Sequence, residues 1–239
     1  MRLGLGLGLG LSAPSRSRGG GGGGAWVPTD IAGCQTWLRA EHGNVDLSGS
    51  QVVTWYDRSG QGRDYSQPTP ANRFTYVEGV YNGHDTVRGS NDYARHMEAA
   101  DWLLTGQATF VVVCSKTTLA NTVIVSQPYW AGTFGSSTGD DFLWTNGADR
   151  LSFTDSASAG LHILTVTQVD GVSIHGYYDG APAFSAVPSN GIAALTNIAE
   201  FVGFNGGAGD LSEFITWDTS LGSSDLVTVH THLATRYGI

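Results

Sequence analysis

Charged residues are scarce in this chain of 239 residues, where they make up 14 % of the sequence, and Lys116 is the single lysine. Disordered proteins combine high charge with low hydrophobicity, and the hydrophobic share of 41 % excludes that class. The sequence contains no run of 18 apolar residues, so it predicts no helix that spans a membrane. Basic residues form no cluster in the body of the chain, which argues against nucleic-acid binding.

Glycine, in contrast, is abundant, with 34 residues against only seven prolines. The glycines keep no three-residue period, which excludes a collagen-like protein. Ten of them fall in the first 24 residues, which read MRLGLGLGLGLSAPSRSRGGGGGG. The sequence therefore predicts a basic Leu-Gly arm at 1–18, a polyglycine hinge at 19–25 and one globular domain at 26–239.

The arm and the domain have opposite charge. The arm contains three arginines and no acidic residue, whereas the rest of the chain holds all 21 acidic residues and nine basic ones. An acidic domain with this balance suits a displayed protein that resists nonspecific adhesion.

Three interpretations of the arm remain open. A secretory signal peptide would use Leu3–Leu11 as its apolar region, although alternate residues there are glycine. A low-complexity segment without fixed structure is the second interpretation. The third is an extended docking strand, in which alternate residues share one face and present it to a partner protein. The particle-docking residues under that interpretation are Leu3, Leu5, Leu7, Leu9, Leu11, Arg16 and Arg18.

Short apolar and β-branched runs between turn residues predict an all-β sandwich or barrel. The expected strands are 51–56, 108–114, 122–125, 141–144, 162–169, 172–178, 200–204 and 211–217. Asp170 and Gly171 lie between two alternating runs and predict a type I′ hairpin turn. A second Asp-Gly pair, Asp179 and Gly180, predicts the next turn.

One long helix is expected at the C-terminus, together with a shorter turn around His96–Leu104. Ser223 or Ser224 would cap the long helix, Asp225 suits its first turn and Gly238 follows its end. Its apolar positions recur at spacings of three and four, so they would form one stripe against the sandwich. These positions are Leu226, Val229, Leu233 and Tyr237.

Five motifs in order resemble the concanavalin A-like, LamG-type jelly-roll domains of bacterial surface proteins and bacteriophage structural proteins. They are TWLRA at 36–40, VTWYDRSGQGRD at 53–64, YVEGV at 76–80, RGSNDY at 88–93 and GDLSEF at 209–214, before a helix that ends RYGI. The resemblance covers about 26–239. It implies an all-β concanavalin A-like jelly-roll sandwich with a C-terminal helix, here preceded by an extended N-terminal arm.

The motif residues are expected to be structural. Asp57 and Ser59 can bind neighbouring backbone amides, and Gly60 and Gly62 allow the loop to reverse. Asp92 would act similarly in its own turn, and Asp210 and Glu213 would lie at the entry of the last strand. Two positions depart from the family pattern, because Arg39 stands where an aspartate is frequent and Arg88 where an aromatic residue is usual.

Catalytic patterns are weak, and the sequence predicts a protein that is not an enzyme. Glycosidases of this fold carry a carboxylate motif of the form E-x-D-x-x-E, which is absent, and Asp140-Asp141 is the closest grouping. Gly135–Gly139 matches G-x-S-x-G, but a strand-like run follows it in place of the helix that a nucleophile elbow requires.

No metal or cofactor is assigned. The seven histidines are scattered, and His230 and His232 lie two apart on the predicted helix, so they cannot share a metal ion. Calcium binding stays open, since related folds use Asp and backbone oxygens, but no ligands can be assigned. Cys34 and Cys114 could pair, and unpaired buried thiols are favoured because each lies in or beside an apolar run.

A sugar site would combine an aromatic face with polar groups that fix the hydroxyls. The residue types needed gather in one predicted loop region, at Tyr129, Trp130, Phe134, Asp140, Trp144 and Asn146. The alternative is that these aromatic residues cover the sandwich core.

The expected function is that of a bacteriophage virion component of the decoration, spike or fibre type. Residues 1–24 would dock on capsid or tail proteins, and the jelly roll would face outward as part of a homo-oligomer, in contact with host surface polysaccharide. The alternative is a secreted carbohydrate-binding or adhesion module with a cleaved signal peptide, which would place the protein outside the cell.

Overall fold

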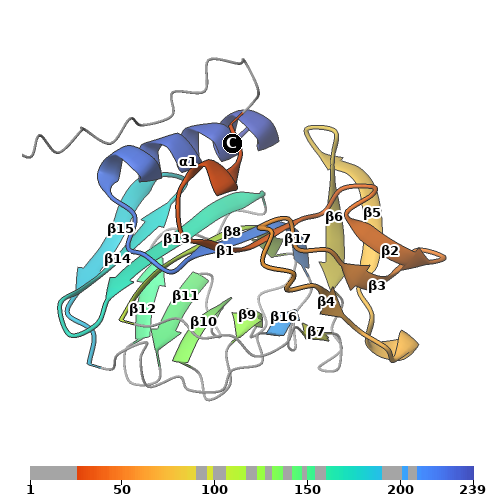
Figure 1. Ribbon diagram of the computed structural model, residues 1–239, viewed down its shortest axis with the longest axis horizontal. Helices are drawn as coiled ribbons and strands as arrows, with labels where there is room; N and C mark the ends of the chain where they lie inside the picture. The colour runs from red at the N-terminus through yellow and green to blue at the C-terminus, as the bar shows by residue number, and fades with distance from the viewer. Residues whose placement is uncertain are drawn as a thin grey trace, which may run out of the picture.

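The domain is a two-layered antiparallel β-sandwich with an α-helix on its outer face (Figure 1). This computed structural model describes residues 26–89, 96–98, 106–116, 123–126, 131–136, 142–146, 150–153, 160–189, 201–203 and 209–239. The arm and hinge predicted at 1–25 lie outside the described residues, so those domain boundaries stay predictions.

The first layer has the strand order β15-β14-β13-β8-β17, and both β1 and β6 pair with the other edge of β17. Its strands are β1 (Cys34–Arg39), β6 (His84–Gly89), β8 (Gln107–Lys116), β13 (His162–Val169), β14 (Ser173–Tyr178), β15 (Ala181–Ala186) and β17 (Gly209–Trp217).

The second layer has the order β2-β3-β4-β7-β16-β9-β10-β11-β12, and β5 joins the layers by pairing with β3 and β6. Its strands are β2 (Val45–Ser48), β3 (Gln51–Trp55), β4 (Tyr65–Ser66), β5 (Thr75–Tyr81), β7 (His96–Glu98), β9 (Val123–Ser126), β10 (Ala131–Ser136), β11 (Phe142–Asn146), β12 (Arg150–Phe153) and β16 (Phe201–Gly203). Neighbouring strands in both layers run antiparallel, which confirms the predicted all-β sandwich.

The helical elements are α1 (Ser223–Tyr237) and the short 3-10 helices η1 (Pro28–Asp30) and η2 (Pro70–Asn72). Within the described ranges, none of these helices has the length and apolar character needed to cross a membrane. Helix α1 lies against the outer face of the first layer, above β8 and β13 (Figure 1).

The central strands of the first layer are buried on both faces. In β8, Phe110 and Val112 face the second layer, while Val111 and Val113 pack under α1. A strand covered on both faces needs no polar alternation, which explains the continuous apolar run that the sequence shows there.

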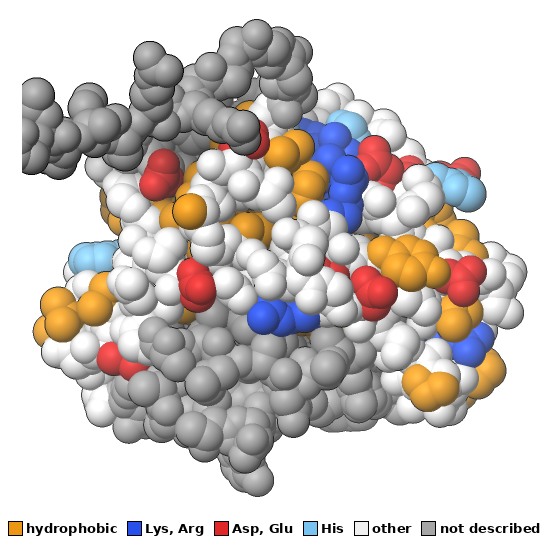
Figure 2. All heavy atoms as spheres, in the orientation of Figure 1, with side chains coloured by type: hydrophobic (Ala, Val, Ile, Leu, Met, Phe, Trp, Pro, Cys, Tyr) orange, Lys and Arg blue, Asp and Glu red, His pale blue; other side chains and the backbone are white. Residues whose placement is uncertain are grey.

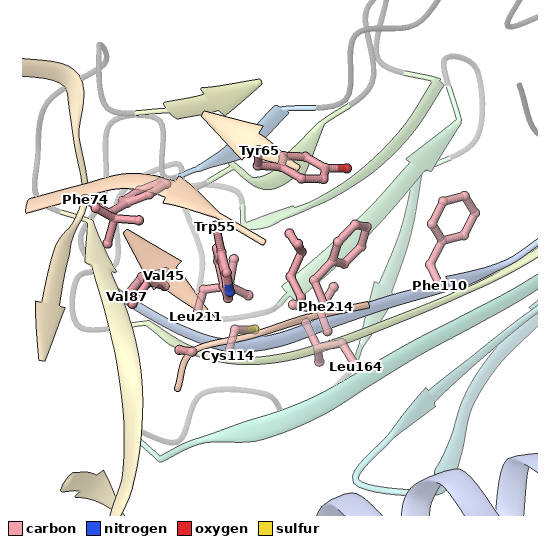
Figure 3. Close-up of a cluster of buried hydrophobic side chains, with 14 of the residues drawn as sticks. Val45, Trp55, Tyr65, Phe74, Val87, Phe110, Cys114, Leu164, Leu211 and Phe214 are labelled. Atoms are coloured by element: carbon pink, nitrogen blue, oxygen red, sulfur yellow. The ribbon is translucent and has the colours of Figure 1, made fainter. Parts of the chain in front are cut away.

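The main core lies between the two layers and is built from large rings and β-branched side chains (Figure 3). Trp55 and Tyr65 from the second layer meet Cys114, Leu164 and Phe214 from the first, and each of them is buried. Burial of this apolar surface is the main favourable term in folding and fixes how the layers pack.

Of the predicted hairpin turns, the one at Asp170 and Gly171 is wrong in type. Val169 pairs with Ser173, so the loop has three residues, and only Gly171 is left-handed, with φ of 65°. A type I′ turn needs positive φ at both central residues. Asp179 and Gly180 meet this requirement, with φ of 49° and 82°, between the paired residues Tyr178 and Ala181.

The end of α1 is confirmed and its start is shifted. Gly238 caps the end in the left-handed conformation, with φ of 72°. The helix begins at Ser223, and its N-cap is Gly222, whose carbonyl accepts from the Leu226 amide. Neither predicted serine is therefore the cap. The predicted turn around His96–Leu104 is also corrected in part, since His96–Glu98 forms β7.

Candidate functional site

Asp57 organises the loop that follows β3, as the sequence predicts. Its Oδ1 accepts from the amides of Trp37 and Ser59, both at 2.9 Å, and its Oδ2 accepts from the Ser59 hydroxyl at 2.6 Å and the Arg63 amide at 3.1 Å. Gly60 has a left-handed φ of 86°, which lets the chain reverse. Because both carboxylate oxygens are occupied by structural donors, this motif holds the loop against β1.

Glu213 lies fully buried in β17, inside the strand and not at its entry. Its Oε1 accepts from Trp37 Nε1 at 2.6 Å and Arg39 Nε at 3.2 Å, and its Oε2 accepts from the Tyr237 hydroxyl at 2.9 Å. Burial, with the nearby carboxylate, raises the pKa of Tyr237 well above its usual value. The cluster ties β1, β17 and α1 together.

Asp210 has the same character at the beginning of β17, where the sequence predicts it. It accepts from Arg88 Nε at 2.6 Å and Arg88 Nη2 at 2.9 Å, a bidentate pair, and from the Tyr81 hydroxyl at 2.8 Å. Burial raises the pKa of Tyr81 to about 12. Arg39 and Arg88, the two departures from the family pattern, are thus the cations that neutralise the two buried carboxylates of β17.

The remaining chemical motifs bring no reactive set together. In the residues that the structure describes, no group of three or more His, Cys, Asp or Glu is placed to hold a metal ion. Gly135 and Ser136 of the G-x-S-x-G match end β10, and 137–139 lie outside the described residues. Cys34 and Cys114 are thiols buried on opposite faces of the first layer, so they do not form a disulfide.

The predicted glycan residues lie around the β10–β11 hairpin. Phe134 pairs with Trp144, and Asn146 with Ala131, while Tyr129, Trp130 and Asp140 lie outside the described residues. Trp144 in turn pairs with Leu151, and directly opposed positions share one face of a sheet. Leu151 packs against the main core. The glycan assignment stays a prediction.

The predicted docking residues Leu3, Leu5, Leu7, Leu9, Leu11, Arg16 and Arg18 also lie outside the described residues. Arg39, Arg58 and Arg236, by contrast, are described, and all three approach Glu41. Figure 2 shows basic side chains gathered in a patch between α1 and β6, beside acidic ones.

A groove that the sequence did not reveal runs along the exposed side of α1 and has a volume of about 790 Å³. We call it the α1 groove, and its lining residues are Trp26, Asn82, His84, Val227, Thr228, Thr231, His232, Thr235 and Arg236. Spacings of three and four along 227–236 place these side chains on one face of the helix, which is the signal that sequence reasoning could have used. The contribution of Trp26, Asn82 and His84 depends on long-range packing.

Two contacts fix the walls of the α1 groove. The β5–β6 turn is of type I′ geometry, with φ of 48° at Asn82 and 78° at Gly83, and the Asn82 Nδ2 donates to the Arg236 carbonyl at 3.1 Å. On the other side, the Trp26 ring lies 4.8 Å from the His232 ring. The groove is therefore held between a hairpin, a helix and the first described residue of the domain.

Both histidines of the groove have a lowered pKa. Burial, followed by the charge of Arg236, lowers the pKa of His84 below its usual value, and burial lowers the pKa of His232. Among the described residues that line the groove, Arg236 is the one permanent cation and none is a carboxylate.

The comparisons with known proteins show the fold and no family. No protein-family model matches the sequence, and no curated protein matches it. Solved structures do match. The botulinum neurotoxin type C protein, whose cell entry depends on two ganglioside molecules, has a TM-score of 0.64 and 11 % identity over 84 % of this chain and 51 % of its own.

Two further neighbours are similar. The binding domain of Paraclostridial Mosquitocidal Protein 1 has a TM-score of 0.59 and 11 % identity, over 83 % of this chain and 52 % of its own. The ligand-binding domain of botulinum neurotoxin serotype D, in complex with N-acetylneuraminic acid, has a TM-score of 0.58 and 10 % identity, over 83 % of this chain and 50 % of its own. The chain spans about half the length of these structures, and the likeness confirms a β-sandwich of the kind found in binding domains.

Proposed function

We propose that this protein is a non-enzymatic adhesion domain, displayed on a bacteriophage virion, that binds surface saccharides through its jelly roll. The observation that carries the proposal is that structural hydrogen-bond donors occupy the carboxylates of the sequence motifs. Asp57, Asp210 and Glu213 are each surrounded by structural donors, so the motifs build a rigid scaffold and leave no carboxylate pair for hydrolysis. A rigid sandwich that supports variable loops is suited to binding.

The saccharide part of the proposal is supported by the fold. Two of the structures with a similar sandwich architecture are named for their interaction with gangliosides or N-acetylneuraminic acid. The aromatic and polar residues around β10 and β11 remain candidates for such contacts. An array of surface saccharides tests this part, and binding to none of them would refute it.

The virion part rests on the arm, the charge contrast and the motif order. An alternating Leu-Gly strand can add to a sheet edge of a capsid or tail protein, and the polyglycine segment 19–25 acts as a joint. Deletion of 1–24 should abolish incorporation into particles while the domain stays folded. Full incorporation of the shortened protein would refute docking through the arm.

A secreted adhesion module is the second candidate, favoured by the nine-residue length of Leu3–Leu11. Mass spectrometry of the mature N-terminus separates the two candidates. A chain that still carries Arg2 excludes cleavage by a signal peptidase, whereas loss of residues 1–13 as a signal peptide supports secretion.

A further inference from the structure

The α1 groove contains hydrogen-bonding groups that have no partner in the described part of the chain. The Nε atom of Arg236 and the Nε2 atom of His232 are both buried from solvent and make no hydrogen bond there. A buried polar atom without a partner costs about 1–3 kcal/mol. These two atoms lie beneath the surface, so a ligand in the groove would meet the exposed part of Arg236, whose side chain is 18 % exposed.

The charge around the groove favours an anion. Three guanidinium groups, those of Arg39, Arg58 and Arg236, share the two carboxylates of Glu41 and Glu213. Arg39 and Arg58 each have a carboxylate oxygen within 3.2 Å, whereas the nearest carboxylate to Arg236 is Glu41 at 3.7 Å, and the Arg236 side chain is 18 % exposed. This local excess of positive charge stands out in a protein with a net charge of −9.

The other lining groups match a sugar better than a compact inorganic anion. Three exposed hydroxyl side chains, Thr228, Thr231 and Thr235, follow one face of α1, and the Asn82 side chain faces them across the groove. Hydroxyl and amide groups exchange hydrogen bonds with sugar hydroxyls, and the half-buried Trp26 ring offers an apolar surface to a sugar ring. The volume of about 790 Å³ lies within the usual range for ligand sites.

We propose that the α1 groove binds a saccharide that carries a carboxylate group, which Arg236 holds by a charge-assisted hydrogen bond while the threonines and Asn82 bind its hydroxyls. This inference rests on the adhesion function proposed above and gives it a site and a ligand class. The site lies on the helix side of the first layer, whereas the β10–β11 candidates belong to the second layer.

The first experiment compares carboxylated saccharides with their neutral counterparts, for example 3′-sialyllactose with lactose and trigalacturonate with its methyl ester. The full chain should bind carboxylated members of the array and not the matched neutral ones, and higher salt should weaken binding. R236Q should lower the affinity for the best probe by about tenfold or more. R73Q removes a cation from the η2 region and should leave the affinity unchanged.

R236Q could also weaken binding by destabilising the domain, so a second variant blocks the groove and leaves Arg236 in place. T231W fills the groove from an exposed helix position and keeps Arg236, so it should abolish binding without lowering the melting temperature. S224W places the same ring at an exposed position of α1 that does not line the groove and should bind normally.

The outcomes separate the two proposals. If the array shows binding that survives both R236Q and T231W, the groove assignment fails while the adhesion function stands. Binding to no saccharide overturns both. Trypsin cleavage after Arg16 and Arg18 that becomes faster in T231W would assign the groove to the chain's own residues 1–25 and overturn a saccharide site.

Discussion

Arg39 donates from Nε to Glu213 Oε1 at 3.2 Å inside the domain, where the Glu213 side chain has no exposed surface. Removing one partner of a buried ion pair leaves the other charge without compensation. R39M should therefore lower the free energy of unfolding by about 3–5 kcal/mol in urea titrations. The double variant R39M/E213Q should recover part of that loss, because the amide introduced by E213Q is neutral, can accept from Trp37 through its oxygen and can donate to the Tyr237 hydroxyl oxygen through its NH2.

Arg58 supplies the control for this pair. It is one-third exposed and pairs with Glu41 at 3.0 Å on the surface. R58M should cost about 1 kcal/mol or less, since exposed pairs contribute little. Equal losses for R39M and R58M would contradict the argument that burial makes the Glu213 charge costly.

The loop after β3 depends on the Asp57 carboxylate. D57A removes the acceptor for the amides of Trp37, Ser59 and Arg63, and it should lower the free energy of unfolding by about 2–4 kcal/mol. Hydrogen exchange at those three amides should become faster. D57N keeps one oxygen acceptor and should have a smaller effect, and a D57N that is as unstable as D57A would argue against these hydrogen bonds.

Gly176 in β14 has a neighbour that excludes a side chain. A Cβ at this position would lie 2.2 Å from the Phe184 ring on β15. G176A should lower the free energy of unfolding by about 1–3 kcal/mol through overpacking. G176A/F184L should be more stable than G176A alone, whereas G222A, where nothing lies within 4 Å, should cost little. If G176A leaves the free energy of unfolding unchanged, the close contact between positions 176 and 184 is refuted.

Stability should fall at mildly acidic pH because of buried histidines. Burial lowers the pKa of His230, whose Nε2 lies 2.9 Å from Thr165 Oγ1, and burial also lowers the pKa of His84 and His232. Below the ordinary histidine pKa of about 6.5, the unfolded chain binds more protons than the folded one. The stability that these histidines contribute is therefore complete above that pH and is lost as the pH falls toward their pKa values in the folded protein.

Urea titrations between pH 7.5 and pH 5 measure this dependence. H230Q should flatten the pH dependence, although it also lowers the stability at pH 7.5. H42Q changes a side chain that is 75 % exposed and should leave the slope as it is. An unchanged slope in H230Q would show that this histidine does not titrate between the two states.

The two cysteines should be unreactive in the folded protein. Both are buried thiols outside any disulfide, and burial, followed by the charge of Asp57, raises the pKa of the Cys34 thiol to about 12. A thiol-specific chromogenic reagent at pH 8 should label neither cysteine in buffer and both in urea. Rapid labelling of one thiol under native conditions would contradict its burial, and absence of labelling in urea would indicate a disulfide.

Local patterns in the sequence were sufficient to predict some of the elements. The runs at 162–169 and 51–56 match β13 and β3 because a buried strand needs a continuous or alternating apolar pattern. The stripe from Leu226 to Tyr237 matches the buried face of α1 for the same reason. The Asp57 loop was predictable because short polar side chains bind amides only a few residues away.

Only the tertiary structure decided which distant groups meet. Nothing local in the sequence indicates that Arg39 pairs with Glu213, or that Arg88 pairs with Asp210, since these contacts join strands more than a hundred residues apart. The α1 groove likewise needs Trp26 and the β5–β6 turn beside the last turns of α1. The scarcity of charge was therefore visible in the sequence, but long-range packing determined which charged residues form buried pairs and which lie beside the α1 groove.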